Sequence, residues 1–119
     1  MATAQDMSDA PHIPEITPTE LKARFDNGDS PVLVDVRERF EQRIADLPNH
    51  DQLRMPTGEF LHRINEIDRD REVVVYCRSG SRSAWAVRLL MDRGFESVLN
   101  LKGGILAWKA EVDPTLRAY

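Results

Sequence analysis

Apolar residues in this chain gather in short runs that alternate with segments where they recur every three or four positions. The runs at Val32–Val36, Val73–Tyr76 and Ser97–Leu101 have the length of β-strands. The first two are apolar almost throughout, which is typical of strands that a parallel sheet buries on both faces. Ile13–Ile16, which contains a proline, predicts a short edge strand, and Leu53–Met55 predicts another short strand.

The segments between these strands predict helices. Thr17 occupies the N-cap position of the first helix, Pro18 is its first residue, and Glu20 completes a capping box. Asn27 and the glycine after it end this helix. Further helices are predicted over residues 38–44, 57–67, 83–93 and 105–110.

Two of these predicted helices have an apolar face. In the helix over residues 57–67, Thr57 is the expected N-cap, and Leu61 belongs to the face that we expect to be buried. In the helix over residues 83–93, Met91 lies on the apolar side, and Gly94 stops the helix.

Alternating strands and helices predict an α/β fold, with a mainly parallel sheet and helices on both faces. A length of 119 residues fits one domain. Residues 1–11 are polar and show no periodicity, so we expect a mobile N-terminal tail followed by a single domain over residues 12–119.

Composition and charge argue against several classes of partner and site. A net charge of −4 and scattered arginines argue against a nucleic-acid partner. No apolar stretch approaches the roughly 18 residues of a membrane-spanning helix, and we find no secretory signal. A single cysteine excludes an internal disulfide and a multi-cysteine metal site. We therefore expect a cytoplasmic protein that has no membrane partner, no metal and no cofactor.

The single cysteine, Cys77, directly follows the predicted strand over residues 73–76. The short polar loop after it leads into a helix, so backbone amides and a helix N-terminus would face the sulfur and stabilise an anion there. Since the thiolate is the nucleophilic form of cysteine, we expect Cys77 to be a catalytic nucleophile rather than an inert buried side chain. The expected substrate-binding residues are those of the loop: Arg78, Ser79, Gly80, Ser81, Arg82 and Ser83.

Other candidate residues are interpreted as structural. Asp35 and Arg37 end the second strand, and we expect them to form a supporting pair. Trp85 and Trp108 are interpreted as packing residues. The three histidines are dispersed and have no partner at ligand spacing, which argues against a metal site or a Cys–His pair: His12, His50 and His62.

Three segments of the chain resemble the rhodanese family, the thiosulfate sulfurtransferases: Leu33–Glu38, Val74–Ser83 and Leu101–Trp108. Their order covers about residues 13–110. The resemblance implies a rhodanese-like fold and double-displacement catalysis without a cofactor. By this resemblance, the Cys77 thiolate takes the outer sulfur of thiosulfate or another sulfane-sulfur donor, and the resulting persulfide gives it to a nucleophilic acceptor.

The end of the chain adds a second resemblance. Val112-Asp113-Pro114 and Tyr119 are similar to the C-terminal rhodanese module of proteins that also carry a sulfur-carrier adenylyltransferase domain. This implies a sulfur-carrier protein as acceptor, with a small thiol as the alternative. Between the second and third predicted strands, Asn49 stands where the family usually has glycine. Because asparagine tolerates the left-handed conformation, we expect the turn to persist.

Two other functions remain open. Phosphatases and arsenate reductases with a related loop place an arginine six residues after the cysteine, whereas this chain has Ser83 there and Arg82 one residue earlier. A non-catalytic interaction module is the other alternative. Such relatives commonly lack the cysteine, which this chain retains.

Overall fold

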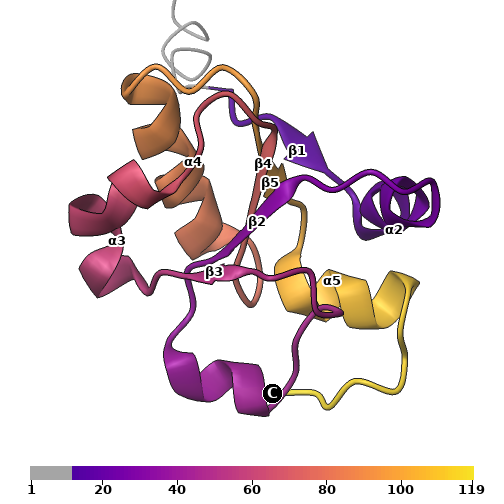
Figure 1. Cartoon of the computed structure of the whole chain (residues 1–119). Helices are drawn as coiled ribbons and strands as arrows, with labels where there is room; N and C mark the ends of the chain where they lie inside the picture. The colour runs from indigo at the N-terminus through magenta and orange to yellow at the C-terminus, as the bar shows by residue number, and fades with distance from the viewer. Residues whose placement is uncertain (1–11) are drawn as a thin grey trace, which may run out of the picture.

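The computed structural model describes residues 12–119, so the tail predicted over residues 1–11 lies outside the described part. Its centre is a five-stranded sheet in the order β1-β5-β4-β2-β3, and every pairing is parallel. Figure 1 shows β4 and β5 crossing the middle of the molecule. The predicted α/β fold with a parallel sheet is therefore confirmed. The strands are β1 (Glu15–Ile16), β2 (Val32–Asp35), β3 (Leu53–Arg54), β4 (Val73–Tyr76) and β5 (Val98–Leu101).

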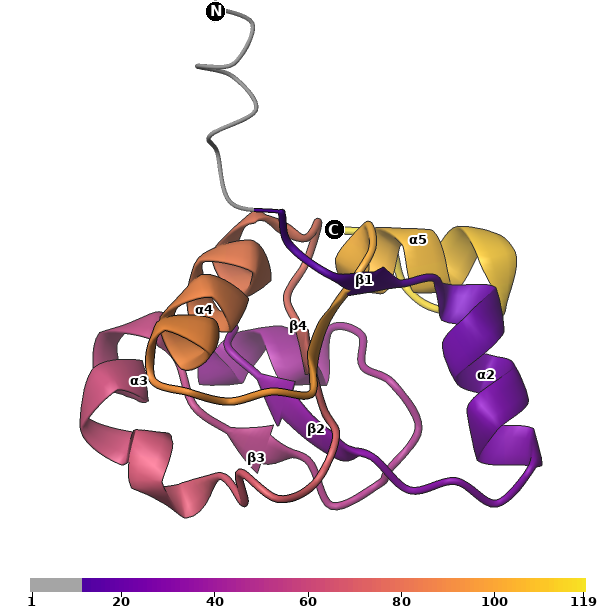
Figure 2. The same cartoon turned by 90° about the horizontal axis from the view of Figure 1, so that it is seen from above.

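Helices cover both faces of this sheet. The pair α3 and α4 lies on one side and the pair α2 and α5 on the other (Figures 1 and 2). The helical segments are α2 (Pro18–Asp26), α3 (Thr57–Arg63), α4 (Ser81–Asp92) and α5 (Gly104–Glu111), with two 3₁₀ helices, η1 (Arg39–Arg43) and η2 (Ile64–Glu66).

Side chains of β4 alternate between the two cores. Val73 and Val75 are buried in the core beneath α3 and α4, whereas Val74 and Tyr76 are buried in the core beneath α2 and α5. This period of two places the next residue, Cys77, on the α3–α4 side. The apolar run that predicted a doubly covered strand thus also fixes which face receives the thiol.

The start of α2 follows the prediction. The Thr17 hydroxyl accepts a hydrogen bond from the Glu20 amide at 3.1 Å, and a Glu20 carboxylate oxygen accepts one from the Thr17 amide at 2.9 Å. These two bonds satisfy amides that have no partner within the helix.

Three sequence predictions about helices were wrong in detail. The N-cap of α3 is Pro56, and Thr57 is already helical. Leu61 is 48% exposed and Met91 is 38% exposed, because each follows a buried residue by one position and so points about 100° away from the sheet. The short helix predicted over residues 38–44 is present as the 3₁₀ helix η1.

The turn before β3 also differs from the prediction. Its left-handed residue is Asp51, with φ 55°, and Asp51 is the one residue other than glycine with positive φ in the described chain. Asn49 instead uses its side chain, whose oxygen accepts a hydrogen bond from the Asp51 amide at 3.0 Å. The side-chain hydrogen bond of Asn49 and the left-handed conformation of Asp51 therefore form the turn together.

Candidate active site

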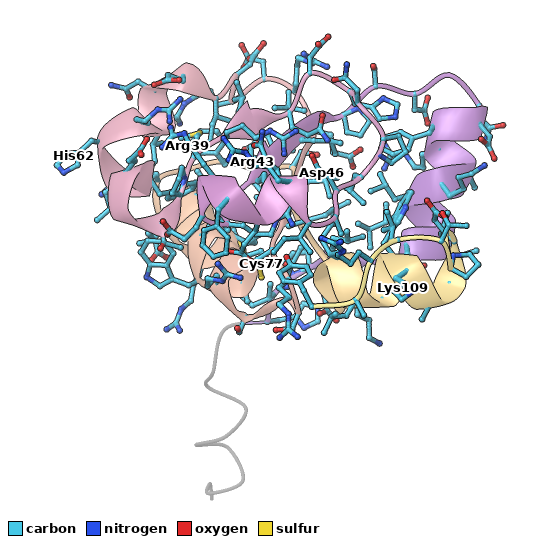
Figure 3. The ribbon with its side chains drawn as sticks, turned by 90° about the horizontal axis from the view of Figure 1, so that it is seen from below. Arg39, Arg43, Asp46, His62, Cys77 and Lys109 are labelled. Atoms are coloured by element: carbon cyan, nitrogen blue, oxygen red, sulfur yellow. The ribbon has the colours of Figure 1, made fainter. Side chains whose placement is uncertain are left out.

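Cys77 lies between the end of β4 and the start of α4. Its side chain is fully buried, and it lies centrally in the molecule in Figure 3. The sulfur accepts hydrogen bonds from the amides of Gly80 at 3.1 Å and Ser83 at 3.4 Å. The Ser83 hydroxyl lies 3.3 Å from the same sulfur. Three polar hydrogens can therefore stabilise negative charge on Cys77.

The first turn of α5 determines which way the loop faces. The amides of Ile105 and Leu106 donate to the carbonyl oxygens of Cys77 and Arg78, each at 3.0 Å. Because these carbonyls are directed to α5, the amides that follow are free to turn toward the sulfur. Gly104 makes this contact possible, since a Cβ there would lie 2.6 Å from the Arg78 carbonyl oxygen.

The turn of the loop depends on Gly80, which has φ 109°. Its carbonyl oxygen accepts hydrogen bonds from the Ala84 amide at 3.0 Å and from the Asn100 side-chain amide at 3.2 Å. Within residues 12–119, no acceptor is found for the loop amides of Ser79, Ser81 and Arg82. The loop thus holds a buried sulfur and still has donors for a further anion.

Arg82 does not point freely into solvent. Its guanidinium donates to both carboxylate oxygens of Glu41, at 2.8 and 3.1 Å, and so joins α4 to η1. Burial acts to raise the pKa of Glu41, but hydrogen bonds from Arg82, the Glu38 amide and the Tyr119 hydroxyl outweigh it and lower the pKa to about 2. Glu41 is therefore a carboxylate throughout the neutral range.

Arg78, the other loop arginine, contacts Tyr119. One terminal nitrogen of Arg78 hydrogen-bonds to the backbone oxygen of Tyr119, and the guanidinium carbon lies 5.1 Å from the centre of the tyrosine ring. Arg78 Nε is buried and has no hydrogen-bond partner among the described residues. Both loop arginines thus have protein partners in this structure.

Tyr119 also connects the loop to a buried ion-pair network. Its hydroxyl donates to Glu41 at 3.0 Å and accepts from Arg37 at 2.9 Å. Burial raises the pKa of Tyr119, the hydrogen bond from Arg37 opposes this, and the bond to Glu41 adds to it. The phenol therefore stays protonated at neutral pH and can bridge the two charged groups.

Arg37 and Asp35 form a two-point pair at the end of β2. Arg37 Nε lies 2.9 Å from Asp35 Oδ1, and Arg37 Nη2 lies 3.0 Å from Asp35 Oδ2. Arg37 also donates to Asp46 and to the carbonyl oxygen of Ala45. Burial lowers the pKa of Arg37, but hydrogen bonds to Asp35 and Tyr119 more than offset this, so the guanidinium is charged. This network positions η1 and, with it, Glu41.

A pocket of about 430 Å³ opens beside the loop between the starts of α3 and α4. Trp85 on its wall is 40% exposed, whereas Trp108 is buried in the opposite core. The pocket borders the loop through Ser81 and Arg82, and Cys77 is not one of its lining residues. Its lining residues are Thr57, Gly58, Ser81, Arg82 and Trp85.

Within the described residues, no hydrogen bond joins a histidine to the sulfur of Cys77, whose partners are Gly80 and Ser83. His62 points outward from α3 in Figure 3, and His50 stacks on Phe25 with ring centres 3.8 Å apart. Within residues 12–119, no group of three side chains from His, Cys, Asp and Glu could hold a metal ion. Over the same residues, no helix has the length and apolar character needed to cross a bilayer.

Several groups at this site were missed from sequence. Glu41 was not recognised, although it stands three residues after Glu38, the spacing of a capping box. Asn100 was not recognised either, although it is a buried polar residue within an apolar strand. Gly103 and Gly104 were interpreted as a turn, yet Gly104 is the first residue of α5 and lies directly against the cysteine loop.

Comparisons with known proteins agree with this geometry. A sulfurtransferase from Allochromatium vinosum is 43% identical over 94 residues, which are 79% of this chain and 86% of that protein. The probable adenylyltransferase/sulfurtransferase MoeZ of Mycobacterium tuberculosis is 31% identical over 116 residues, 98% of this chain but 30% of MoeZ. These relatives support sulfur transfer as the general activity.

A solved structure with a similar fold and a protein-family model agree with these relatives. The crystal structure of a rhodanese-related protein from Thermoplasma volcanium has a TM-score of 0.74 and 28% identity, over 83% of this chain and 93% of that one. The rhodanese-like domain model matches residues 17–111. This match spans most of the chain and includes the whole cysteine loop, so the protein belongs to the rhodanese family.

Proposed function

We propose that this protein transfers sulfane sulfur from thiosulfate, or a similar donor, to a nucleophilic acceptor through a persulfide on Cys77. The observation that carries the proposal is the set of donors around the sulfur: the Gly80 amide at 3.1 Å, the Ser83 amide at 3.4 Å and the Ser83 hydroxyl at 3.3 Å. Such donors favour the thiolate, which is the form that attacks.

The first half-reaction forms the persulfide. The Cys77 thiolate attacks the outer sulfur of thiosulfate, the sulfur–sulfur bond of the donor breaks, and sulfite leaves with the electron pair. The negative charge then rests on the terminal sulfur of the persulfide. The amides of Ser79, Ser81 and Arg82, which have no acceptor within residues 12–119, are proposed to bind this charge.

The second half-reaction regenerates the thiolate. A nucleophilic acceptor attacks the terminal sulfur, the persulfide bond breaks, and the electron pair returns to the sulfur of Cys77. No metal, cofactor or external oxidant enters this balance. A cysteine that must stay reduced fits a reducing compartment, so we place the reaction in the cytoplasm.

Arg78 and Arg82 are proposed to attract the anionic donor. Arg82 borders the pocket beside the loop, so a donor entering there meets a guanidinium. The Glu41 carboxylate, 2.8 Å away, neutralises part of the charge of Arg82, and the backbone oxygen of Tyr119 accepts a hydrogen bond from Arg78. The donor therefore competes with two groups of the protein itself.

For the acceptor we propose a sulfur-carrier protein, with a small thiol such as glutathione as the alternative. Support comes from the similarity to MoeZ, which spans 98% of this chain. A flexible carrier tail is narrow enough to enter the pocket beside the loop. With an adenylylated carrier, the terminal sulfur of the persulfide attacks the acyl carbon and displaces AMP, which leaves an acyl disulfide on Cys77. A thiol reductant such as dithiothreitol, added after this step, should then cleave the disulfide and release the carrier with the thiocarboxylate mass. Transfer to small thiols alone would rule out the carrier but leave sulfur transfer intact.

Steady-state kinetics test the proposed reaction. With thiosulfate and cyanide varied together, double displacement predicts parallel double-reciprocal lines and release of sulfite before cyanide is added. Cys77→Ser should abolish sulfite release, because a serine hydroxyl is almost wholly protonated at neutral pH. Intersecting lines, or sulfite release that survives in Cys77→Ser, would refute the mechanism.

A further inference from the structure

The Ser83 hydroxyl has more acceptors than hydrogens. Its oxygen lies 2.5 Å from Asn100 Oδ1, 3.2 Å from the Gly80 carbonyl oxygen and 3.3 Å from the sulfur of Cys77. A hydroxyl carries one hydrogen, and a thiolate sulfur, like the two oxygens, can only accept it. Whether this hydrogen points to the sulfur or to Asn100 must therefore depend on the charge of the sulfur.

The orientation of the Asn100 amide is fixed by its surroundings. Asn100 Nδ2 donates to the Gly80 carbonyl oxygen at 3.2 Å, so Oδ1 faces Ser83. Reversing the amide would place two carbonyl oxygens against each other. The Asn100 backbone amide donates to Pro14 at 2.8 Å, and its side chain is buried. Asn100 thus presents a rigid acceptor to Ser83.

The sheet brings this acceptor to the sulfur. Asn100 on β5 pairs with Val75 on β4, and Cys77 follows Val75 by two positions on the same face. Asn100 therefore reaches the base of the loop from the neighbouring strand. Within the described residues, the sulfur is hydrogen-bonded to Gly80 and Ser83 and not to Asn100. An effect of Asn100 on the hydrogen bonds of the sulfur must therefore pass through Ser83 or Gly80.

We propose that Asn100 is a positioning residue that holds the Ser83 hydrogen while the sulfur of Cys77 is uncharged and releases it when that sulfur becomes a thiolate. The proposal rests on the proposed function. In the resting thiolate, Ser83 donates to the sulfur. In the persulfide, the negative charge lies on the terminal sulfur, and the Cys77 sulfur is a neutral divalent atom. The Ser83 hydroxyl then rotates and donates its hydrogen to Asn100.

The return transfer reverses this rotation. When cyanide attacks the terminal sulfur, thiocyanate forms, the persulfide bond breaks, and its electron pair returns to Cys77. The Ser83 hydroxyl then rotates back and stabilises the leaving thiolate. Asn100 and the thiolate compete for one hydrogen, so removing the Asn100 oxygen should favour the thiolate, while removing the Ser83 hydroxyl should disfavour it.

Alkylation of the reduced protein by iodoacetamide tests this without any sulfur donor. The rate is measured at a series of pH values from about 4 to 9. The midpoint of the curve of rate against pH reports where the thiolate forms. For Ser83→Ala the midpoint should rise by about one pH unit, and for Asn100→Leu it should fall by about half a unit. Ser83→Thr keeps the hydroxyl and should restore the wild-type midpoint.

The double variant separates positioning from a merely structural role. In the Ser83→Ala background, Asn100→Leu should leave the midpoint unchanged, because the hydrogen for which Asn100 competes is absent. The Gly80 carbonyl still accepts from the Ala84 amide at 3.0 Å, so the loop keeps one anchor. The charged groups of the loop and of its partner η1 are the same in every variant: Arg78 in the loop, Arg82 on α4 and Glu41 on η1.

Opposite shifts that vanish in the double variant would support the proposal. Shifts in the same direction, or an Asn100 effect that persists without the Ser83 hydroxyl, would overturn it. Should Asn100→Leu not fold, Asn100→Ala repeats the test. Because alkylation needs no donor, a protein that passes this test but releases no sulfite would contradict the proposed function and not the role of Asn100.

Discussion

Arg82 donates to both carboxylate oxygens of Glu41, at 2.8 and 3.1 Å, and this pair joins the start of α4 to η1. An arginine proposed to attract the donor is therefore held by a buried carboxylate. The same residue can attract the donor, fasten the loop to the fold, or do both. Substitutions on the two sides of the pair separate these roles.

If Arg82 attracts the donor, Arg82→Ala should raise KM for thiosulfate. The loss of a charge-assisted contact predicts about 1.5–3 kcal/mol, or roughly one to two decades in kcat/KM. Glu41→Gln should lower KM, because it frees the guanidinium. If Arg82 only fastens the loop, both variants should lose thermal stability by similar amounts. Their KM values should then either change in the same direction or stay at the wild-type value. Added salt should raise KM less in Arg82→Ala than in wild type, because only Arg78 then attracts the donor.

Glu41 should make the protein less stable in acid. Its pKa is lowered from 4.5 to about 2 in the folded protein, because hydrogen bonds outweigh burial. The stabilisation is therefore fully present above about pH 4.5 and is lost as the pH falls toward 2, by up to about 3 kcal/mol. Urea unfolding at several pH values should show a smaller acid loss in Glu41→Gln than in wild type.

The matched control for this prediction is Glu66→Gln. Glu66 is half exposed and pairs with Arg63 at 2.8 Å on the surface. Surface pairs contribute little, so this variant should keep the wild-type acid profile. An identical acid loss in wild type and Glu41→Gln would show that Glu41 does not contribute.

Among the glycines with positive φ, Gly104 is the one whose substitution by alanine should disturb the cysteine loop most. The added Cβ would lie 2.6 Å from the Arg78 carbonyl oxygen, which is backbone and cannot move aside cheaply, at φ 57°. We expect a loss of at least about 3 kcal/mol in unfolding free energy. Gly28→Ala is the control, since φ there is 86° and nothing lies within 4 Å, so backbone strain of about 1–2 kcal/mol is expected. Equal losses in the two variants would exclude steric contact with the loop as the cause.

Wild-type protein should not hydrolyse aryl phosphates. Ser83 occupies the position where the related phosphatases have arginine, and the Arg82 guanidinium is bound to Glu41. Inserting one residue after Ser81 would move the arginine to that position and widen the loop. Appreciable phosphatase activity in the unmodified protein, measured with an aryl phosphate, would contradict the argument from loop length.

The sequence predicted those features that depend on neighbouring residues. The apolar run over residues 73–76 and the polar loop after it were enough to place Cys77 between a strand and a helix N-terminus. The capping box at Thr17 was predicted for the same reason, since its partners are three residues apart. Both features follow from local backbone preferences.

Other features could not be predicted, because they join segments far apart in the chain. Glu41 meets Arg82 across 41 positions, and Tyr119 meets Glu41 across 78. Asn100 reaches the loop only because β5 lies beside β4. Leu61 was misassigned for a related reason: helical spacing shows that an apolar face exists, but not which of two adjacent apolar residues the sheet will cover.

Intact mass spectrometry after exposure to thiosulfate tests the central claim most directly. Wild-type protein should gain the mass of one sulfur atom, and cyanide or dithiothreitol should remove it. Cys77→Ser should gain nothing, because Cys77 is the only cysteine in the chain. A wild-type protein that stays at its unmodified mass, or an equal gain in Cys77→Ser, would contradict the account of Cys77 as the residue that carries the transferred sulfur.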